Sequence, residues 1–500
     1  MGAFILLLNR ISQQDNVAVA IEELTVGELY TVGAISVAPN VTIPKGHKIA
    51  LVDIPVGAHV IKYGFPIGHA VQEIKMGDWI HSHNVKTNLA ETLEYQYHPV
   101  TAENTIPPMP KTFKGYRREN GKVGVRNEIW IIPTVGCVNR TAQLIASGAN
   151  DQFKRAEHID GIYEFTHPYG CSQLGEDHST TQKILADLVH HSNAAGVLVL
   201  GLGCENNNIE EFKKVLGEYD ARRVKFLVAQ DVEDEIEDGI QLIGQLVKSA
   251  SADQREACPI SELIIGLKCG GSDGFSGITA NPLVGEFSDK LVANGGTSIL
   301  TEVPEMFGAE TILMDRAINE EVFGNIVHLI NDFKKYYDDH QQPIYENPSP
   351  GNKKGGITTL EEKSLGCTQK GGRSQVVDVL GYGDIVRTKG LTLLSAPGND
   401  MVAATALAAS GCQIILFTTG RGTPLGTAVP TMKIATNSEI FKRKANWMDF
   451  DAGVLLQGEA MDKVAEELLL QVIHVASGTL TKSEEMGFRE IAIFKNGVTL

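Results

Sequence analysis

The sequence predicts a multidomain α/β protein that begins with a small all-β module. Three observations support this fold class: the length of 500 residues, a series of short β-type segments in residues 1–95, and apolar segments that alternate with helical ones from about residue 125. A chain of this length exceeds one typical hydrophobic core, so we expect two or three domains.

Residues 1–95 form the predicted all-β module. Helical periodicity is almost absent here, apart from the segment NVAVAIEEL. Glycine adopts the backbone angles of tight turns more readily than other residues, so glycines between β-type runs indicate short strands joined by turns. The glycines in question are Gly46, Gly57, Gly64, Gly68 and Gly77.

Residues 96–124 are predicted to be a linker. This range contains Pro99, Pro107, Pro108 and Pro110 within twelve positions. Proline at this density opposes both a helix and a central strand.

Two α/β blocks follow, and we place the boundary between them near residue 255. Residues 125–254 form the second domain and residues 255–500 the third. Apolar runs such as AGVLVLGLG and ELIIGL are bounded by glycine and followed by helical segments. This pattern is typical of buried parallel strands in α/β layers.

Charge and hydropathy exclude several classes of function. The net charge of −17 disfavours nucleic acid and anionic membranes as partners, because both attract a basic surface. No apolar stretch approaches the ~18 residues of a membrane span, and the start of the chain lacks a signal-peptide pattern. We therefore expect a soluble cytoplasmic enzyme that acts on a small molecule.

Seven cysteines, an odd number without a C-x-x-C pair, argue against a disulfide framework and a zinc ribbon. Cys258 is interpreted as incidental and Cys412 as a core residue. A glycine leaves the backbone beside a thiol accessible, and a thiol is a soft ligand, so this pairing suits a metal ion or cluster. Six cysteines adjoin a glycine: Cys137, Cys171, Cys204, Cys269, Cys367 and Cys412.

Polar residues follow several predicted strands, where ligands of open α/β sheets bind. The usual nucleotide and hydrolase motifs are absent: GLGCENN lacks the third glycine of a dinucleotide fingerprint, and no P-loop, G-x-S-x-G or H-E-x-x-H occurs. The polar residues at strand ends are Asn206, Asp273, Glu302, Asn399, Arg421 and Thr423.

The segment HSHNVKTN carries a second group of candidates. His81 and His83 are two positions apart, and on a strand both imidazoles would share one face, as metal binding or acid–base chemistry requires. Asn84, Lys86 and Asn88 add hydrogen-bond donors suited to a carboxylate or to hydroxyl groups.

The chain resembles the altronate and galactarate dehydratase family. The resemblance runs from end to end and is carried by VIKYGFPIGHA, HSHNVKTNL, NGKVGVRNEIWIIPTVGCVN, YGCSQLGEDH, GLGCENN, CGGSDGFSGITANP and FTTGRGTPLGTAVPTMKIATN. It implies an N-terminal β-clip domain of the SAF type, a second domain used in dimerisation, and a C-terminal Rossmann-like parallel sheet without a dinucleotide role.

The resemblance also implies iron-dependent dehydration of a sugar acid in hexuronate breakdown: D-altronate would give 2-dehydro-3-deoxy-D-gluconate and water. Galactarate and sulfolactate are the substrates of related members. A divalent metal stabilises the enediolate that forms when the proton beside a carboxylate is removed. Fe²⁺ is the expected ion, with Mn²⁺ as an alternative.

Our working hypothesis distributes the roles as follows. Proton transfer falls to Asp273 or Glu302, with His83 as a further catalytic candidate. The metal ligands are drawn from His81, His83, Cys269 and Cys367. The substrate is held by Asn84, Lys86, Asn206, Asn399, Arg421 and Thr423.

Three alternatives remain open. A metal site of oxygen and nitrogen ligands alone would leave out Cys269. An iron–sulfur dehydratase would use three thiols from Cys137, Cys171, Cys204, Cys269 and Cys367. A non-catalytic sugar-acid binder would have little use for so many thiols and carboxylates at strand ends.

Overall fold

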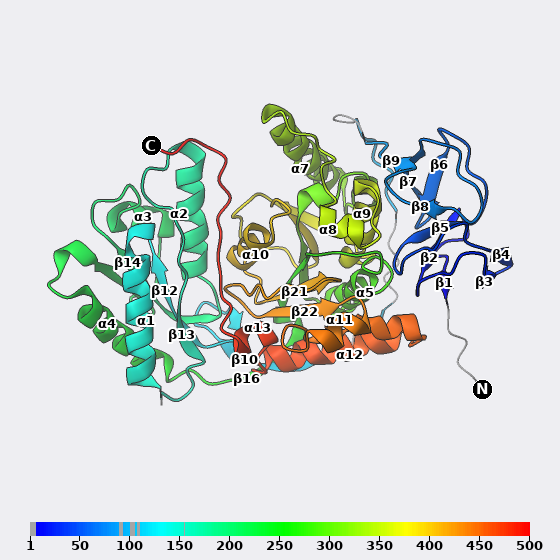
Figure 1. Ribbon diagram of the computed structural model, residues 1–500. Coiled ribbons are helices and arrows are strands. Elements are labelled where there is room, and N and C mark those ends of the chain that lie inside the picture. The colour runs from blue at the N-terminus through cyan, green and yellow to red at the C-terminus, as the bar shows by residue number, and fades with distance from the viewer. Residues whose placement is uncertain (1–6, 90–93, 101–105, 108–110, 155) are drawn as a thin grey trace.

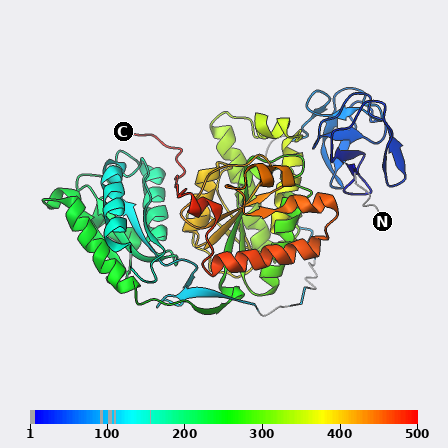
Figure 2. The same ribbon diagram turned by 60° about the horizontal axis from the view of Figure 1, so that its bottom comes forward.

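The computed structural model describes residues 7–89, 94–100, 106–107, 111–154 and 156–500. The start of the chain and two linker prolines, Pro108 and Pro110, lie outside these ranges. An N-terminal β-domain (residues 7–89) lies at one end of the molecule and a second domain (residues 118–255) at the other. The C-terminal domain (residues 260–485) lies between them (Figures 1 and 2). The predicted fold class is confirmed.

The β-domain consists of short antiparallel strands in sheets of order β1-β2-β5-β8, β3-β4 and β6-β7-β9. The five predicted turn glycines all have positive φ. At Gly77, for example, a Cβ would lie 2.2 Å from the carbonyl oxygen of Ala38. The strands are β1 (Leu8–Asn9), β2 (Val17–Ala20), β3 (Tyr30–Val32), β4 (Ile35–Val37), β5 (Lys48–Ala50), β6 (His59–Lys62), β7 (Phe65–Ala70), β8 (Trp79–Ile80) and β9 (Val85–Lys86).

A small antiparallel ribbon separates the second domain from the rest of the chain. Strands β10 (Thr112–Arg117) and β11 (Val123–Gly124) lie inside the range predicted as linker, and β16 (Glu256–Pro259) pairs with β10. The chain therefore enters and leaves the second domain through adjacent strands.

The second domain is a parallel sheet of order β13-β12-β14-β15. Apolar residues alternate along β12 between a face covered by α1 and α4 and a face covered by α2 and α3. The strands are β12 (Glu128–Pro133), β13 (Gly161–Glu164), β14 (Ala194–Gly201) and β15 (Val224–Val228). The helices are η1 (Gly136–Val138), α1 (Asn139–Phe153), α2 (Gly175–Val189), α3 (Ile209–Leu216), η2 (Ala229–Asp231) and α4 (Glu235–Ala250).

The C-terminal domain holds a seven-stranded parallel sheet of order β19-β20-β18-β17-β21-β22-β23. Its strands are β17 (Ile264–Cys269), β18 (Thr297–Leu300), β19 (Val376–Leu380), β20 (Leu391–Leu394), β21 (Ile414–Thr419), β22 (Thr431–Ala435) and β23 (Phe450–Asp451). The α-helices are α5 (Ala280–Ala293), α6 (Glu310–Met314), α7 (Glu320–Asp339), α8 (Pro350–Lys354), α9 (Leu360–Cys367), α10 (Asp400–Ala409), α11 (Ser438–Arg443), α12 (Met461–Ala476) and α13 (Lys482–Glu485). Shorter 3₁₀ turns are η3 (Ile260–Glu262), η4 (Val303–Glu305), η5 (Thr368–Gly371) and η6 (Ala452–Gln457).

Strand β17 is the centre of this sheet and its topological switch point, because β18 lies on one side of it and β21 on the other. In open parallel sheets, ligands bind beyond the carboxyl ends of the strands at such a point. Cys269 is the last residue of β17.

The C-terminal tail (residues 486–500) runs back to the second domain (Figure 1). The backbone N–H of Leu500 donates to the carbonyl of Ser172 at 2.9 Å. Ile491 and Ile493 are buried in a core that also contains residues of α2 and α10. The second and C-terminal domains therefore share one hydrophobic core. Among the helices of the described ranges, none has both the length and the apolar character to cross a membrane.

Candidate functional site

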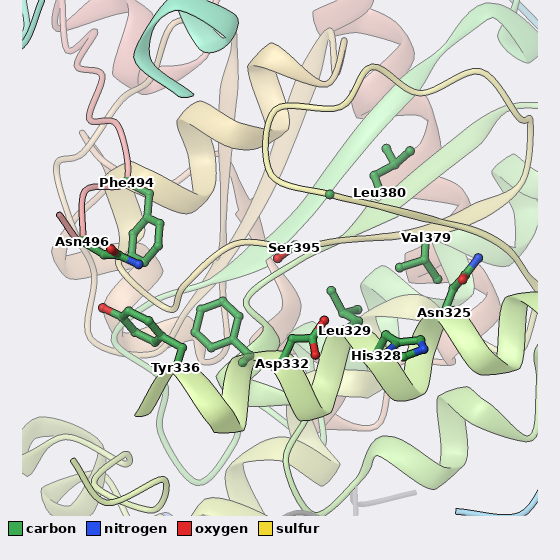
Figure 3. A pocket seen from close by; sticks show the side chains of 12 residues that line it. Asn325, His328, Leu329, Asp332, Tyr336, Val379, Leu380, Ser395, Phe494 and Asn496 are labelled. Atoms are coloured by element: carbon green, nitrogen blue, oxygen red, sulfur yellow. The ribbon is translucent and has the colours of Figure 1, made fainter. Parts of the chain in front are cut away.

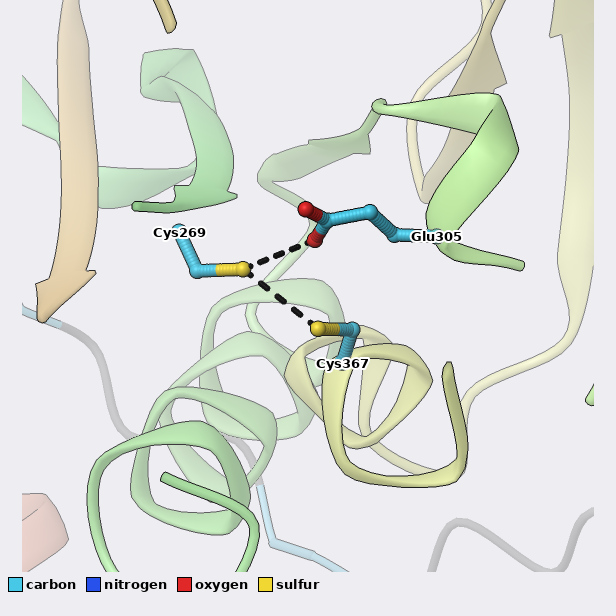
Figure 4. Close-up of side chains that lie close together, drawn as sticks. All are labelled: Cys269, Glu305 and Cys367. Atoms are coloured by element: carbon cyan, nitrogen blue, oxygen red, sulfur yellow. Dashed lines mark hydrogen bonds between the residues drawn. The ribbon is translucent and has the colours of Figure 1, made fainter. Parts of the chain in front are cut away.

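Two thiols and a carboxylate meet at the end of β17. Figure 4 shows Cys269, Glu305 and Cys367 pointing toward one another from β17, η4 and α9. The Cys269 Sγ lies 2.9 Å from Glu305 Oε2 and 3.4 Å from Cys367 Sγ. In the described part of the chain, this is the one group of three or more His, Cys, Asp or Glu side chains whose ligand atoms lie within 4.8 Å of one another.

The ionisation of this group prepares it for a cation. The hydrogen bond from the Cys367 thiol lowers the pKa of Cys269 to about 6, and the same bond raises the pKa of Cys367. Burial raises the pKa of Glu305, but the ammonium groups of Lys363 and Lys370 outweigh burial and hold it at about 2. The Cys269 thiol donates to Glu305 Oε2, and a divalent cation that replaced this proton would be held by a thiolate and a carboxylate together. The sulfur-rich ligand set fits Fe²⁺ better than Mg²⁺.

Three buried lysines surround the group. Lys363 Nζ lies 2.7 Å from Glu305 Oε1, and Lys268 Nζ lies 2.9 Å from Glu302 Oε1. Lys370 Nζ is 4.0 Å from the other oxygen of Glu302. This concentration of positive charge in a water-poor site suits a substrate carboxylate.

Lys268 also connects the buried group to the surface. Its ammonium contacts Asp400 Oδ1 at 2.7 Å, and the Asp400 side chain is 37% exposed. Burial lowers the pKa of Lys268, but attraction by Glu302 and Asp400 outweighs burial and leaves the pKa above its ordinary value. Asp400 is therefore the exposed end of this series of contacts.

The β-domain packs over the same group. Lys48 and Lys62 contact the two oxygens of Glu362, on α9, at 2.9 and 2.8 Å, and all three side chains are buried. Glu362 lies in the same helix as Cys367. The β-domain thus docks against the helix of its own chain that carries Cys367.

The glycines after Cys269 explain this close docking. A Cβ at Gly274 would lie 1.9 Å from the carbonyl oxygen of Gly46, and one at Gly277 would lie 2.2 Å from the Tyr63 hydroxyl. A cavity of about 10 Å³, the space of roughly one water molecule, remains between Tyr63, Asp273 and Cys367.

A larger pocket of about 480 Å³ lies apart from this group (Figure 3). It is bounded by α7, by the ends of β19 and β20, and by the tail. Its lining includes His328, Asp332, Ser395 and Asn496, and it contains none of the residues predicted from the sequence.

Comparison with known families covers nearly the whole chain. Residues 7–88 match the altronate/galactarate dehydratase SAF domain, and residues 115–251 match the second domain of D-galactarate dehydratase/altronate hydrolase. Residues 260–499 match the C-terminal domain of D-galactarate/altronate dehydratase. The chain belongs to the altronate and galactarate dehydratase family.

Among relatives in this family, the altronate dehydratase of Bacillus subtilis is 56% identical over 98% of this chain and 99% of its own length. The altronate dehydratase of Escherichia coli is 54% identical over 98% of this chain and 99% of its own length. The galactarate dehydratase (L-threo-forming) of Escherichia coli is 35% identical over 90% of each chain. The family assignment makes this chain a hydro-lyase.

The structure brings two predicted carboxylates close to the Cys269 group. Glu302 follows β18 and accepts from the Cys269 N–H at 2.8 Å; burial, followed by repulsion from Glu305, raises its pKa. Asp273 is buried, and it accepts hydrogen bonds from Thr436 Oγ1, Ser276 Oγ, the Phe275 N–H and Asn437 Nδ2. Those bonds hold the loop after Cys269.

The expectation that His81 and His83 lie on a strand is wrong, because β8 ends at Ile80. Asn84 closes a turn here: its Oδ1 accepts from the His81 N–H and its Nδ2 donates to the Trp79 carbonyl, both at 2.9 Å. His81 Nδ1 lies 3.3 Å from Thr358 Oγ1, at the boundary with the C-terminal domain. Neither histidine joins the Cys269 group, and their metal role stays a prediction.

The remaining predicted residues fall in three places. Asn399 caps α10, and Arg421 is tied to the Cys269 loop by its N–H, which donates to the Gly271 carbonyl at 3.0 Å. Thr423 lies two residues beyond Arg421, at the same sheet edge. Lys86 is exposed on β9 of the β-domain. Asn206 belongs to the second domain, where its Oδ1 accepts from the Ser172 N–H.

Sequence reasoning missed Glu305, Lys268, Lys363, Lys370 and Glu362. Lys268 immediately precedes Cys269 in an apolar segment that is predicted to be a buried strand. Lysine is rarely buried without a partner, so a lysine in that segment was the available sign of a functional site. The others become neighbours only through contacts distant in the sequence.

Proposed function

We propose that this protein removes water from D-altronate to give 2-dehydro-3-deoxy-D-gluconate, in the breakdown of hexuronates. The observation that carries this substrate is the whole-length match to two altronate dehydratases at 56% and 54% identity. The galactarate dehydratase matches at 35%, which makes galactarate the second candidate substrate.

The reaction requires a base for the proton beside the carboxylate and a positive environment for the enediolate. Glu302 is the base in this proposal, because it is buried at the group and its carboxyl faces Lys268. Lys268, Lys363 and Lys370 stabilise the negative charge that develops. Asp273 and His83 remain the other candidates; the four hydrogen bonds to Asp273 favour a positioning role.

The proposed cofactor is Fe²⁺, with Mn²⁺ as the alternative. Cys269, Cys367 and Glu305 would hold it, because their ligand atoms converge and are buried. A bound divalent ion supplies a Lewis acid that polarises a substrate oxygen.

Residues around this group would bind the rest of the substrate. Asn399, Arg421 and Thr423 belong to loops at the same sheet edge, and Asn84 and Lys86 belong to the β-domain. We also propose that the protein is a cytoplasmic homodimer formed through the second domain; the family resemblance supports this.

The test is an anaerobic assay of chelator-stripped protein with Fe²⁺ or Mn²⁺ restored. D-Altronate and galactarate are offered in parallel, and keto-acid formation is measured. Metal-dependent turnover of D-altronate is the expected result. Turnover of galactarate alone would replace the substrate, and metal-independent turnover would refute the cofactor.

A further inference from the structure

A second set of thiols lies far from the Cys269 group, at the edge of the second domain. Cys137, Cys171 and Cys204 follow β12, β13 and β14. These strands are neighbours in the order β13-β12-β14, and they are parallel, so the three cysteines come after the same ends of adjacent strands. All three thiols are exposed.

The three loops are bonded to one another. The N–H of Gly136 donates to the carbonyl of Tyr169 at 2.8 Å, and the N–H of Asn207 donates to the carbonyl of Gly170 at 3.0 Å. The N–H of Ser172 donates to Asn206 Oδ1 at 3.1 Å. Because these residues adjoin or nearly adjoin the cysteines, the bonds fix the three loops as one surface.

These loops also pack more closely than side chains would allow. A Cβ at Gly170 would lie 1.9 Å from the carbonyl oxygen of Thr134. Two buried polar atoms of the same loops, Gln173 Nε2 and Asn207 Oδ1, have no hydrogen-bond partner in the described structure. Buried polar atoms are normally paired, so these two are unsatisfied within the described part of the protein.

The three cysteines lie close to helix starts. Helices α1, α2 and α3 begin within five residues of Cys137, Cys171 and Cys204, and the N-terminal end of a helix favours an anionic ligand such as a sulfide-containing cluster. The protein contacts of the thiols are weak: Gln230 Nε2 donates to Cys204 Sγ at 3.6 Å, and Cys171 Sγ lies 3.8 Å from Ser172 Oγ.

At least two of the three sulfurs are too far apart to share one tetrahedral ion. A tetrahedral ion bound at about 2.3 Å holds its sulfurs roughly 3.8 Å apart. The ligand atoms of these three cysteines do not all lie within 4.8 Å of one another in the described structure. A polynuclear cluster binds each thiolate to a different metal atom, so its ligand sulfurs are farther apart.

We propose that Cys137, Cys171 and Cys204 bind an iron–sulfur cluster of the [4Fe–4S] type. Three protein thiolates leave the fourth iron open to an oxygen ligand, such as water or the hydroxyl or carboxylate of a small acid. This site is separate from the Cys269 group and does not depend on the proposed dehydration.

The test uses the full-length protein, incubated anaerobically with Fe²⁺ and sulfide and then desalted. We expect about four acid-labile sulfides per chain and a broad visible absorbance band. Sulfide is the decisive readout, because a single iron at Cys269 brings none. The absence of sulfide from the wild-type protein would overturn the inference.

Variants locate the cluster. Cys137→Ser, Cys171→Ser and Cys204→Ser should each lose at least four-fifths of the sulfide, with melting temperatures near that of the wild type because all three positions are exposed. Cys258→Ser and Cys269→Ser are the controls and should keep it. Sulfide retained by the triple serine variant would refute the site. The readout is sulfide and not turnover, so this result does not depend on the outcome of the dehydration assay.

Discussion

Glu302 has a strained backbone at the candidate site. Its backbone is left-handed, with φ 70° and ψ 61°, a conformation that costs a non-glycine residue about 1–2 kcal/mol. Its two carboxyl oxygens face Lys268 and the Cys269 N–H. Strain of this kind is concentrated at functional sites, where surrounding contacts maintain it.

Replacing Glu302 by glutamine should therefore slow turnover without unfolding the protein. The amide keeps the shape and a hydrogen-bond acceptor but removes the base, so kcat for D-altronate should fall by about 10²–10⁴-fold. Steady-state kinetics and bound iron are measured together, and iron should be retained.

Glu310→Gln is the matched control, because Glu310 is also buried and paired with a lysine, Lys334, at 3.1 Å. Its kcat should stay within a factor of a few of the wild type. Equal rates for Glu302→Gln and the wild type would transfer the role of base to Asp273 or His83.

His191 makes stability depend on pH. Burial lowers its pKa from 6.5 to about 4. The unfolded chain therefore binds a proton more readily than the folded one, and the contribution of His191 to stability is complete above pH 6.5 and is lost as the pH falls toward 4. The loss is on the order of 3 kcal/mol. Urea unfolding at pH 7 and 4.5 measures it, and His191→Gln should flatten the dependence; an unchanged slope would contradict this account.

At the scale of elements, helix α9 joins the β-domain to the metal-ligand group. One turn and a half separates Glu362, which binds Lys48 and Lys62, from Cys367. Burial raises the pKa of Glu362, but the two ammonium groups outweigh burial and hold it at about 2. The position of the β-domain and the position of the thiol are thus set by one helix.

Glu362→Gln should detach the β-domain, because two buried ammonium groups lose their counter-ion. Removing one partner of a buried ion pair costs about 3–5 kcal/mol. Hydrogen exchange of β5 and β6 should increase, and turnover should fall with it. Lys75→Met, which breaks exposed pairs with Glu73 and Asp53, should leave the melting temperature and the exchange of β5 close to those of the wild type. Equal protection of β5 in Glu362→Gln and in the wild type would refute the docking role.

Local patterns in the sequence were sufficient to predict the central strand of the C-terminal sheet and the turns of the β-domain. Glycines at Gly46 and Gly77 marked real turns, and the apolar run before Cys269 is the central strand. Cys412 is fully buried, as expected for a core residue. These features depend on residues within a few positions of each other, so periodicity and turn chemistry reveal them.

The composition of the site depends on contacts that no local pattern contains. Cys269 and Cys367 were proposed as ligands from the sequence. Glu305 was not, because it lies in the 3₁₀ turn η4, and the position of that turn depends on the order of the strands. The prediction of a strand at His81 is wrong, because the side chain of Asn84 closes a turn there. A side-chain hydrogen bond three residues away competes with strand pairing, and spacing alone does not reveal which wins.

For the whole molecule, the shared core makes the second and C-terminal domains one cooperative unit. Residues of α2, α10 and the tail pack together in it. We expect these domains to unfold in a single transition, because neither buries its apolar face without the other.

Ile493→Ala tests this coupling. Ile493 is 1% exposed, and its truncation should cost about 2–5 kcal/mol. With Trp79 and Trp447 replaced by phenylalanine in both proteins, Trp130, which is buried in the same core, reports the second domain by fluorescence, and circular dichroism reports both domains. Coincident shifts are expected. Val498→Ala, at a position 74% exposed, is the control and should change stability by about 0.5 kcal/mol or less. A shift of the Trp130 signal alone would show that the domains unfold separately.

The pairing of β10 with β16 also determines the order of events during synthesis. Strand β10 leaves the ribosome first, and its partner β16 follows only after the second domain. At 5–20 residues per second, the intervening chain of about 140 residues takes roughly 7 to 28 s to emerge. The strands of the second domain are therefore all available and can pair on the nascent chain, but the apolar face of this domain stays partly uncovered at that stage. Its core against α10 closes only after the C-terminal domain has been made.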